Sequence, residues 1–172
     1  KAGRADYGNN RTIAIGSEAL ISNTTGANNL AVGYKALEDM VDGVHNIAIG
    51  REAGKNLTKN QNVAIGHRAL PHISTGTNHT GIGIGVGDGE NGTAITGGAG
   101  TILIGHKCDG NASDTSYSIV IGYSSVSKGD STGFISPNDG AVYQGNNSSS
   151  WSTTSDRRIK KNIVDNTVGL DA

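Results

Sequence analysis

A short apolar motif that ends in glycine recurs seven times along this chain. In the clearest copy, Asn46-Ile47-Ala48-Ile49-Gly50, two large β-branched residues flank an alanine. The copies occupy residues 12–16, 29–33, 46–50, 62–66, 81–85, 101–105 and 118–122. Their closing glycines are 17, 17, 16, 19, 20 and 17 residues apart. Such a period is typical of solenoids, in which each repeat is one supersecondary unit, so we predict an all-β, elongated β-helix or β-roll.

The three central residues of each copy predict a short strand that is apolar on both faces. Alternate residues of a strand point to opposite sides, so Ile47 and Ile49 share one face and Ala48 lies on the other. Since neither face is polar, we expect both to be buried. The alanine face predicts the close approach of another backbone, which lateral association of identical chains would supply. The closing glycine can turn the chain at positive φ.

The rest of each period predicts corners and turns. Two polar residues followed by Ala-Leu, as in Tyr34-Lys35-Ala36-Leu37, predict an exposed corner and then a short inward segment. Asn, Asp and Gly dominate the remainder, and these residues favour turns because they tolerate left-handed conformations. One repeat holds little apolar area, so its stability must come from stacked neighbours and from lateral association.

Composition excludes several classes of function. Twenty-seven glycines and single Trp, Phe and Met residues leave few large side chains for a globular core. A net charge of −1 argues against a nucleic-acid partner and a charged membrane surface. No stretch approaches the roughly 20 apolar residues that span a bilayer, so we expect no membrane insertion. Cys108, the only cysteine, is expected to fill space in a repeat rather than to react.

The histidines do not form a recognisable metal site, and we expect neither a metal nor a cofactor. Their spacing lacks the short pairs typical of zinc ligands, and His67 and His106 occupy the position after the repeat glycine, where Tyr34 stands in another copy. A position that accepts such different side chains predicts an exposed corner. Residues 87–92 match Gly-x-Gly-x-x-Gly but carry two acids and no following helix, so a turn, or a cation loop, fits better than a phosphate site.

The chain changes character towards its C-terminal end. We predict a repetitive shaft over residues 1–128, a β-hairpin and linker over 129–154, and a different unit over 155–172. The hairpin is expected at residues 133–143, with an Asn-Asp-Gly turn. In the last unit Ser155 or Asp156 would cap a short helix.

Together, the repeats and the tail resemble a known family. The repeats over residues 12–122 are similar to the trimeric β-helical segments of bacteriophage tail fibres and spikes, and to the head repeats of trimeric autotransporter adhesins. The tail, Ser155-Asp156-x-x-Ile159-Lys160-x-x-Ile163, resembles the opening of the self-cleaving intramolecular chaperone of phage fibres, endosialidases and neck appendages. Residues 155–172 are too few for a whole chaperone, so we expect only its beginning here.

The resemblance implies a homotrimer and a single-turnover self-cleavage, with no other enzymatic activity. It places a Ser-Lys dyad on Ser155 and Lys160 and the scissile bond after Thr154. A lysine is a suitable base for serine where a buried amine with a lowered pKa takes the hydroxyl proton. The alternative for this segment is a capped surface helix with solvated basic residues.

The function implied is that of a phage tail fibre or spike, a virion protein that acts outside the cell. Its trimeric shaft would serve host attachment, with a host cell-surface glycan or protein receptor and other tail proteins as partners. Three identical sets of corners would sum weak contacts into avidity. The alternatives are an adhesin head and a polysaccharide depolymerase. A depolymerase needs paired carboxylates in an aromatic groove, and the sequence shows no such pair, although a cleft between subunits could assemble one.

Overall fold

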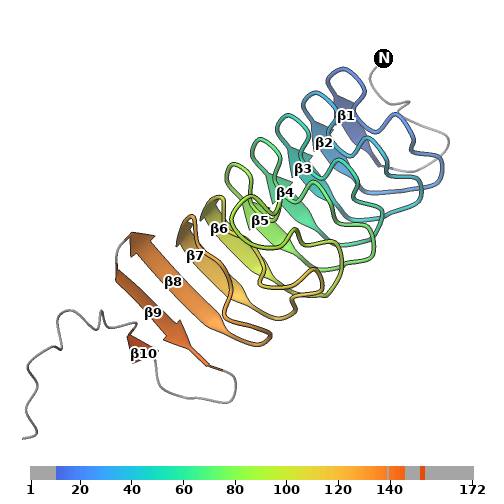
Figure 1. Ribbon diagram of the computed structural model, residues 1–172. Helices are drawn as coiled ribbons and strands as arrows, with labels where there is room; N and C mark the ends of the chain where they lie inside the picture. The colour runs from blue at the N-terminus through green and yellow to red at the C-terminus, as the bar shows by residue number, and fades with distance from the viewer. Residues whose placement is uncertain (1–10, 139, 146–151, 154–172) are drawn as a thin grey trace, which may run out of the picture.

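The computed structural model describes residues 11–138, 140–145 and 152–153. Within these ranges the chain forms a β-solenoid whose coils stack along one axis (Figure 1). Ten strands and no helix are present there, and the strands form one sheet in chain order. They are β1 (Ile13–Ile15), β2 (Leu30–Val32), β3 (Ile47–Ile49), β4 (Val63–Ile65), β5 (Thr80–Ile82), β6 (Ile102–His106), β7 (Ile119–Tyr123), β8 (Gly133–Asn138), β9 (Gly140–Gln144) and β10 (Ser152–Thr153). The predicted all-β solenoid is confirmed.

The sheet is parallel along the repeats and antiparallel at its C-terminal edge. Strands β1 to β8 pair in parallel because each coil returns the chain to the same side of the stack. Strands β8 and β9 then form the hairpin predicted at residues 133–143, and β10 pairs with β9. The proposed unit boundaries stay predictions. The predicted helix start at Ser155 lies outside the described residues.

The register of β5 corrects the alignment of the fifth repeat. Gly81 pairs with Ala64, and Ile82 pairs with Ile65, so the closing glycine of this repeat is Gly83 rather than Gly85. The alternating glycines at 81, 83 and 85 allow the sequence pattern to slide by two residues unnoticed. With Gly83 in place, the spacings become 17, 17, 16, 17, 22 and 17 residues. The irregularity is thus a single longer loop between β5 and β6.

The closing glycines form a column in which successive backbones touch. Gly50 has φ +133, and a Cβ added there would lie 2.5 Å from the carbonyl oxygen of Gly66 in the next coil. Left-handed backbone also occurs at large residues that the sequence did not suggest, such as Lys35 (φ 57) and Leu37 (φ 52). Their N–H groups donate to Ser17 and Ala53 in neighbouring coils. These inter-coil hydrogen bonds therefore help to hold strained corners in place.

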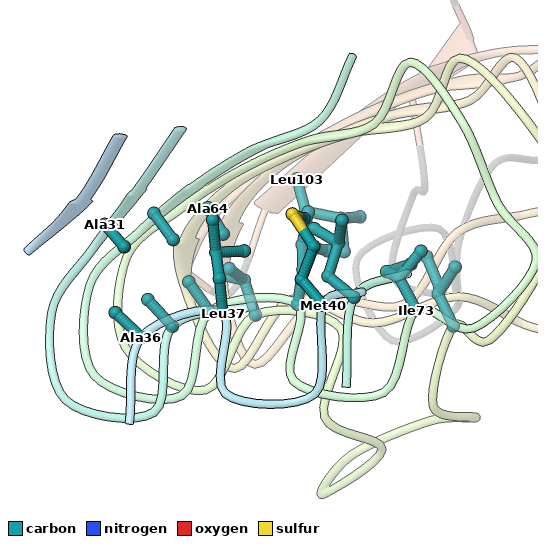
Figure 2. Packing of buried hydrophobic residues seen from close by; sticks show 14 of the residues in the cluster. Ala31, Ala36, Leu37, Met40, Ala64, Ile73 and Leu103 are labelled. Carbon is teal, nitrogen blue, oxygen red and sulfur yellow. The ribbon is translucent and has the colours of Figure 1, made fainter. Parts of the chain in front are cut away.

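The core corrects the expected orientation of the strands. Ala31, Ala48 and Ala64 are fully buried inside their own coils, whereas Ile47 and Ile49 are 37% exposed. Figure 2 shows strand alanines and corner leucines in the same buried layer. The prediction that another chain covers the alanine face is therefore wrong. The opposite wall of the coil covers it, and in these coils the corner leucines leave room only for small strand residues.

A column of polar side chains runs through the buried side of the stack. The side-chain oxygen of Asn29 accepts the N–H of Asn46, that of Asn46 accepts the N–H of Asn62, and that of Asn62 accepts the N–H of His79, each at 2.9 Å. The next N–H, of Thr101, donates to His79 Nδ1 at 3.3 Å. Since buried N–H groups need partners, this ladder accounts for the polar first residue of the motifs from Asn29 to His79.

Candidate functional site

The catalytic residues predicted from the sequence cannot be placed. Thr154, Ser155 and Lys160 lie outside the described residues, so the dyad and its scissile bond stay predictions. The described residues instead present two surfaces that bear on function. One is an apolar face on the strands, and the other is a charged set of corners beside it.

The apolar face consists of the outward side chains of the parallel strands, and we call it the isoleucine face. It contains two columns that follow the strand register. Its apolar members are Ile13, Ile15, Leu30, Val32, Ile47, Ile49, Val63, Ile65, Ile82, Ile102, Ile104, Ile119 and Ile121. Thr80 interrupts one column between Val63 and Ile102. Ile15 is 59% exposed. At a strand spacing of about 4.8 Å the columns run for roughly 30 Å. Soluble monomers rarely expose so continuous an apolar surface.

The corners that follow the first four closing glycines carry charges of alternating sign. Glu18, Lys35, Glu52 and Arg68 occupy the same position in successive coils, and all four have positive φ. Lys35 Nζ lies 3.0 Å from Glu38 and 3.4 Å from Glu18. The hydrogen bond that Lys35 donates to Glu38, and then the one that it donates to Glu18, hold the pKa of Lys35 well above its usual range, although burial acts in the opposite direction. The corners are thus joined across coils by ion pairs.

A hollow lies between the corners that follow β3 and β4, and we call it the corner pocket. Its volume is about 340 Å³. The lining side chains all come from these two corners and are Arg51, Glu52, Lys55, Asn56, His67, Arg68, Pro71 and His72. Three permanent cations and one carboxylate therefore face the hollow. Sequence reasoning missed this site because neighbouring coils build it, although the charge alternation at the shared corner position was readable in the sequence.

The loop at residues 87–92 folds around a buried carboxylate. Asp109 is fully buried, and its two oxygens accept the N–H groups of Gly89, Asn91 and Gly92 at 2.8 to 3.1 Å. Burial raises the pKa of the nearby Asp88 carboxyl. An acid already occupies the place where a phosphate would sit, which favours the turn interpretation. Among the residues that the structure describes, no three metal-ligating side chains come together.

The histidines and the cysteine separate into different roles. His67 is exposed, as predicted for its corner. The same prediction for His106 is wrong, because His106 ends β6, is half-buried and stacks on Tyr123 with ring centroids 5.0 Å apart. His79 is buried in the polar ladder, where burial lowers its pKa. The signal for this role was its place in the motif, where Asn62 stands one coil earlier. Cys108 lies in the core as expected, and burial raises the pKa of its thiol.

Comparison with known proteins adds no identification. No protein-family model, curated protein or solved structure gives a match to this chain. In the part of the chain that the structure describes, no helix is long and apolar enough to cross a membrane. The isoleucine face and the corners therefore carry the functional argument.

Proposed function

We propose that this chain is the homotrimeric shaft of a bacteriophage tail fibre or spike, which serves attachment to a host cell. The observation that supports this most is the isoleucine face, which a single chain leaves open to water. The face is uncharged over its whole length, and its side chains, apart from Leu30, are β-branched and stiff. Such a surface is suited to permanent burial rather than to reversible contact.

A second and a third copy of the same chain are the occupants that fit the face best. All partners would then present the same two columns at the same spacing, so the side chains match coil by coil. The closed symmetry of homo-oligomers favours identical surfaces in this way. The number three comes from the resemblance of residues 12–122 to trimeric fibres. Three inward isoleucine faces would leave three sets of corners pointing to solvent.

The same resemblance gives the rest of the proposal. The shaft would join other tail proteins in the virion, and its corners or its distal end would contact a host glycan or protein receptor. Maturation would cut the bond after Thr154, with Ser155 as nucleophile and Lys160 as base. An adhesin head is the second candidate, because its repeats share the motif and would use the isoleucine face in the same way. Self-cleavage at residue 155 distinguishes the two.

Oligomeric state tests the shaft directly. Native mass spectrometry of the chain at micromolar concentration should give a trimer. The pair Ile47→Asp and Ile49→Asp should give monomers or aggregates, because two charges per chain would have to enter an apolar interface. The matched control is Thr24→Asp with Thr25→Asp, which places two charges on exposed turn residues. A wild-type chain that stays monomeric and soluble would contradict the proposal.

Processing tests the fibre against the adhesin. A longer gene product that extends past residue 172 should separate into two fragments at the Thr154–Ser155 bond. Ser155→Ala should abolish the cut, whereas Ser152→Ala should leave it unchanged. Intact mass measured on the purified product provides the readout. An uncut wild-type product would remove the chaperone assignment and favour the adhesin head.

A further inference from the structure

The corner pocket contains cationic groups whose hydrogen-bonding capacity is largely unused. Arg68 has carboxylate oxygens of Asp88 and Glu90 at 4.0 and 3.7 Å, which is beyond hydrogen-bond distance. The side chain of Arg51 is 63% exposed, and it makes one hydrogen bond, to Glu52 at 3.1 Å. A guanidinium carries five N–H donors in a planar fork that matches a carboxylate. Most of these donors therefore remain available to a ligand.

Within the lining itself, cations outnumber carboxylates, because Glu52 is the only acid among the lining residues. Three further carboxylates lie 3.6 to 4.0 Å from Lys55 or Arg68, just outside the lining, and belong to Glu38, Asp88 and Glu90. With these acids included the region has no net positive charge. A carboxylate ligand is therefore favoured by the unused N–H donors of the two guanidinium groups rather than by net charge.

Neutral polar groups complete the lining. The Asn56 amide and the rings of His67 and His72 supply donors and acceptors, and the buried Pro71 supplies a small apolar surface. Hydroxyl groups need this mixture of donors and acceptors, whereas a bare anion does not. The volume of about 340 Å³ lies at the lower end of the range for ligand pockets. It suits a sugar unit of a longer glycan rather than a large ligand.

We propose that the corner pocket binds an acidic saccharide, with the sugar carboxylate between Arg51 and Arg68 and its hydroxyls on Asn56 and the two histidines. This inference rests on the proposed role in host attachment and names the class of receptor. Each chain holds a complete pocket, because all lining residues come from two coils of one chain. Three pockets on a trimer would add weak single contacts into useful avidity.

The test measures binding to the wild-type protein with defined probes. Isothermal titration and ligand-observed NMR would use tetragalacturonic acid, its fully methyl-esterified form and inorganic phosphate. The acid should bind, and the neutral ester should bind at least about tenfold more weakly, because charge-assisted hydrogen bonds are lost. Phosphate should bind more weakly than the acid. Equal binding of the ester would overturn the charge argument, and equal binding of phosphate would overturn the saccharide assignment.

Variants locate the site. Arg51→Ala and Arg68→Ala should each weaken binding of the acid by about tenfold, and Arg68→Lys should restore only part of the loss, because lysine lacks the planar fork. Lys59→Ala removes the same charge from an exposed turn outside the pocket and should leave binding unchanged. Unchanged binding in both arginine variants would overturn the proposal. Circular dichroism melts would show that each variant is folded.

The oligomeric state of each sample separates this inference from the proposed function. A trimer that does not bind the acid would contradict the proposed saccharide site and leave the proposed trimeric shaft standing. A monomer that binds the acid, and that loses binding in the arginine variants as expected, would support the proposed saccharide site and contradict the proposed trimeric shaft. Since one chain forms the whole pocket, both outcomes are readable on the same preparation.

Discussion

The coils that contain β1 to β4 (the early coils) and those that contain β6 to β8 (the late coils) fill the same narrow interior differently. The large buried side chains come from the corner wall in the early coils and from the strand wall in the late coils. In the early coils the strand supplies alanine, as in Ala48 and Ala64, and the corner supplies a large residue such as Leu37 or Leu70. In the late coils the strand supplies the bulk, with Leu103, Val120 and Phe134 aligned in register. The late corners carry small residues in return, such as Cys108 and Ser125.

The change from large corner residues to large strand residues takes place around β5 and β6. The side chain of Leu70 occupies the space that a Cβ on Gly81 would need, and its Cγ lies 2.5 Å from that position. One coil later, Leu103 Cδ1 lies 3.3 Å from the place of a Cβ on Gly87. The combined volume of the inward strand residue and the facing corner residue therefore stays about the same from coil to coil. This explains why the repeat looks looser after residue 71 although the fold continues.

The stability of both the early and the late coils depends most strongly on the column of closing glycines. A substitution in this column should therefore lower the free energy of unfolding more than any other substitution that we propose. Gly50→Ala adds backbone strain of about 1–3 kcal/mol at φ +133. It also adds an overlap with Gly66 O that costs about 1–3 kcal/mol more. We expect loss of the cooperative thermal transition or a large drop in the free energy of unfolding, measured by urea titration.

Gly129→Ala is the matched control for that substitution. Gly129 has φ +128, but a Cβ there would meet no atom within 4 Å. The substitution should therefore show the strain alone. If the two variants were equally stable, contact between stacked backbones would not be the reason for the glycine column.

The exchange of bulk between walls predicts a coupled pair at the junction. Leu70→Ala alone should lower the free energy of unfolding by about 2–5 kcal/mol because it leaves a cavity. Gly81→Ala alone should destabilise through overlap with Leu70. The double variant should be more stable than the sum of the two losses predicts, by about 0.5–3 kcal/mol. Additive losses in the double-mutant cycle would show that the two walls do not share one volume.

The polar ladder also changes along the solenoid, since His79 occupies the position that asparagine has in the early coils. Burial lowers the pKa of His79 below its ordinary value of 6.5, although the backbone carbonyls of Gly97 and Gly98 act in the opposite direction. The unfolded chain therefore binds the proton more readily than the folded one. Stability should be unaffected above pH 6.5 and should fall as the pH drops below it, until the folded pKa is passed.

His79→Asn tests this step, because it continues the ladder of Asn29, Asn46 and Asn62. The variant should lose the part of the pH dependence that begins as the pH falls below 6.5, measured as the melting temperature in matched buffers. His67→Asn is the control, since His67 is exposed on its corner and its replacement should leave the profile as in the wild type. An unchanged profile in His79→Asn would place the acid sensitivity elsewhere.

The strands and the hairpin were predictable from the sequence for a physical reason. A period near 17 residues with a closing glycine follows from coils whose backbones touch, so the motif marks each strand directly. The inward face was not predictable, because Ile47 and Ala48 are both apolar and alternation alone does not say which one points inward. Only the thinness of the coil decides it, and that is a property of two walls together.

The corner pocket was hidden for a related reason. Arg51 and Arg68 are 17 residues apart in the chain and become neighbours only when the coils stack in register. The register of the fifth copy was also ambiguous, since Gly83 and Gly85 each follow an isoleucine and could each close the motif. Sequence therefore identifies the repeat unit reliably, whereas the sites that neighbouring units build need the stacked structure.

The smallest effect is expected from the ion pairs on the corners, which both halves carry on their surfaces. In the early coils Lys35 pairs with Glu38, and in the late coils Lys107 pairs with Glu90. Glu90 raises the pKa of Lys107, as Glu38 does for Lys35. A raised lysine pKa contributes stability below pH 10.5 that is lost only as the pH rises further, so neither pair should affect the pH profile near neutrality.

Lys35→Gln and Lys107→Gln should each lower the melting temperature slightly in dilute buffer. The difference from the wild type should shrink in 1 M salt, where the screening length falls to about 3 Å. Lys35 lies between two acids, Glu18 and Glu38, whereas Lys107 has one, so the early variant should show the larger salt-dependent loss. A loss that persists in high salt would assign the effect to the packing of the lysine stem, and the corners of the two halves would then differ in packing rather than in charge.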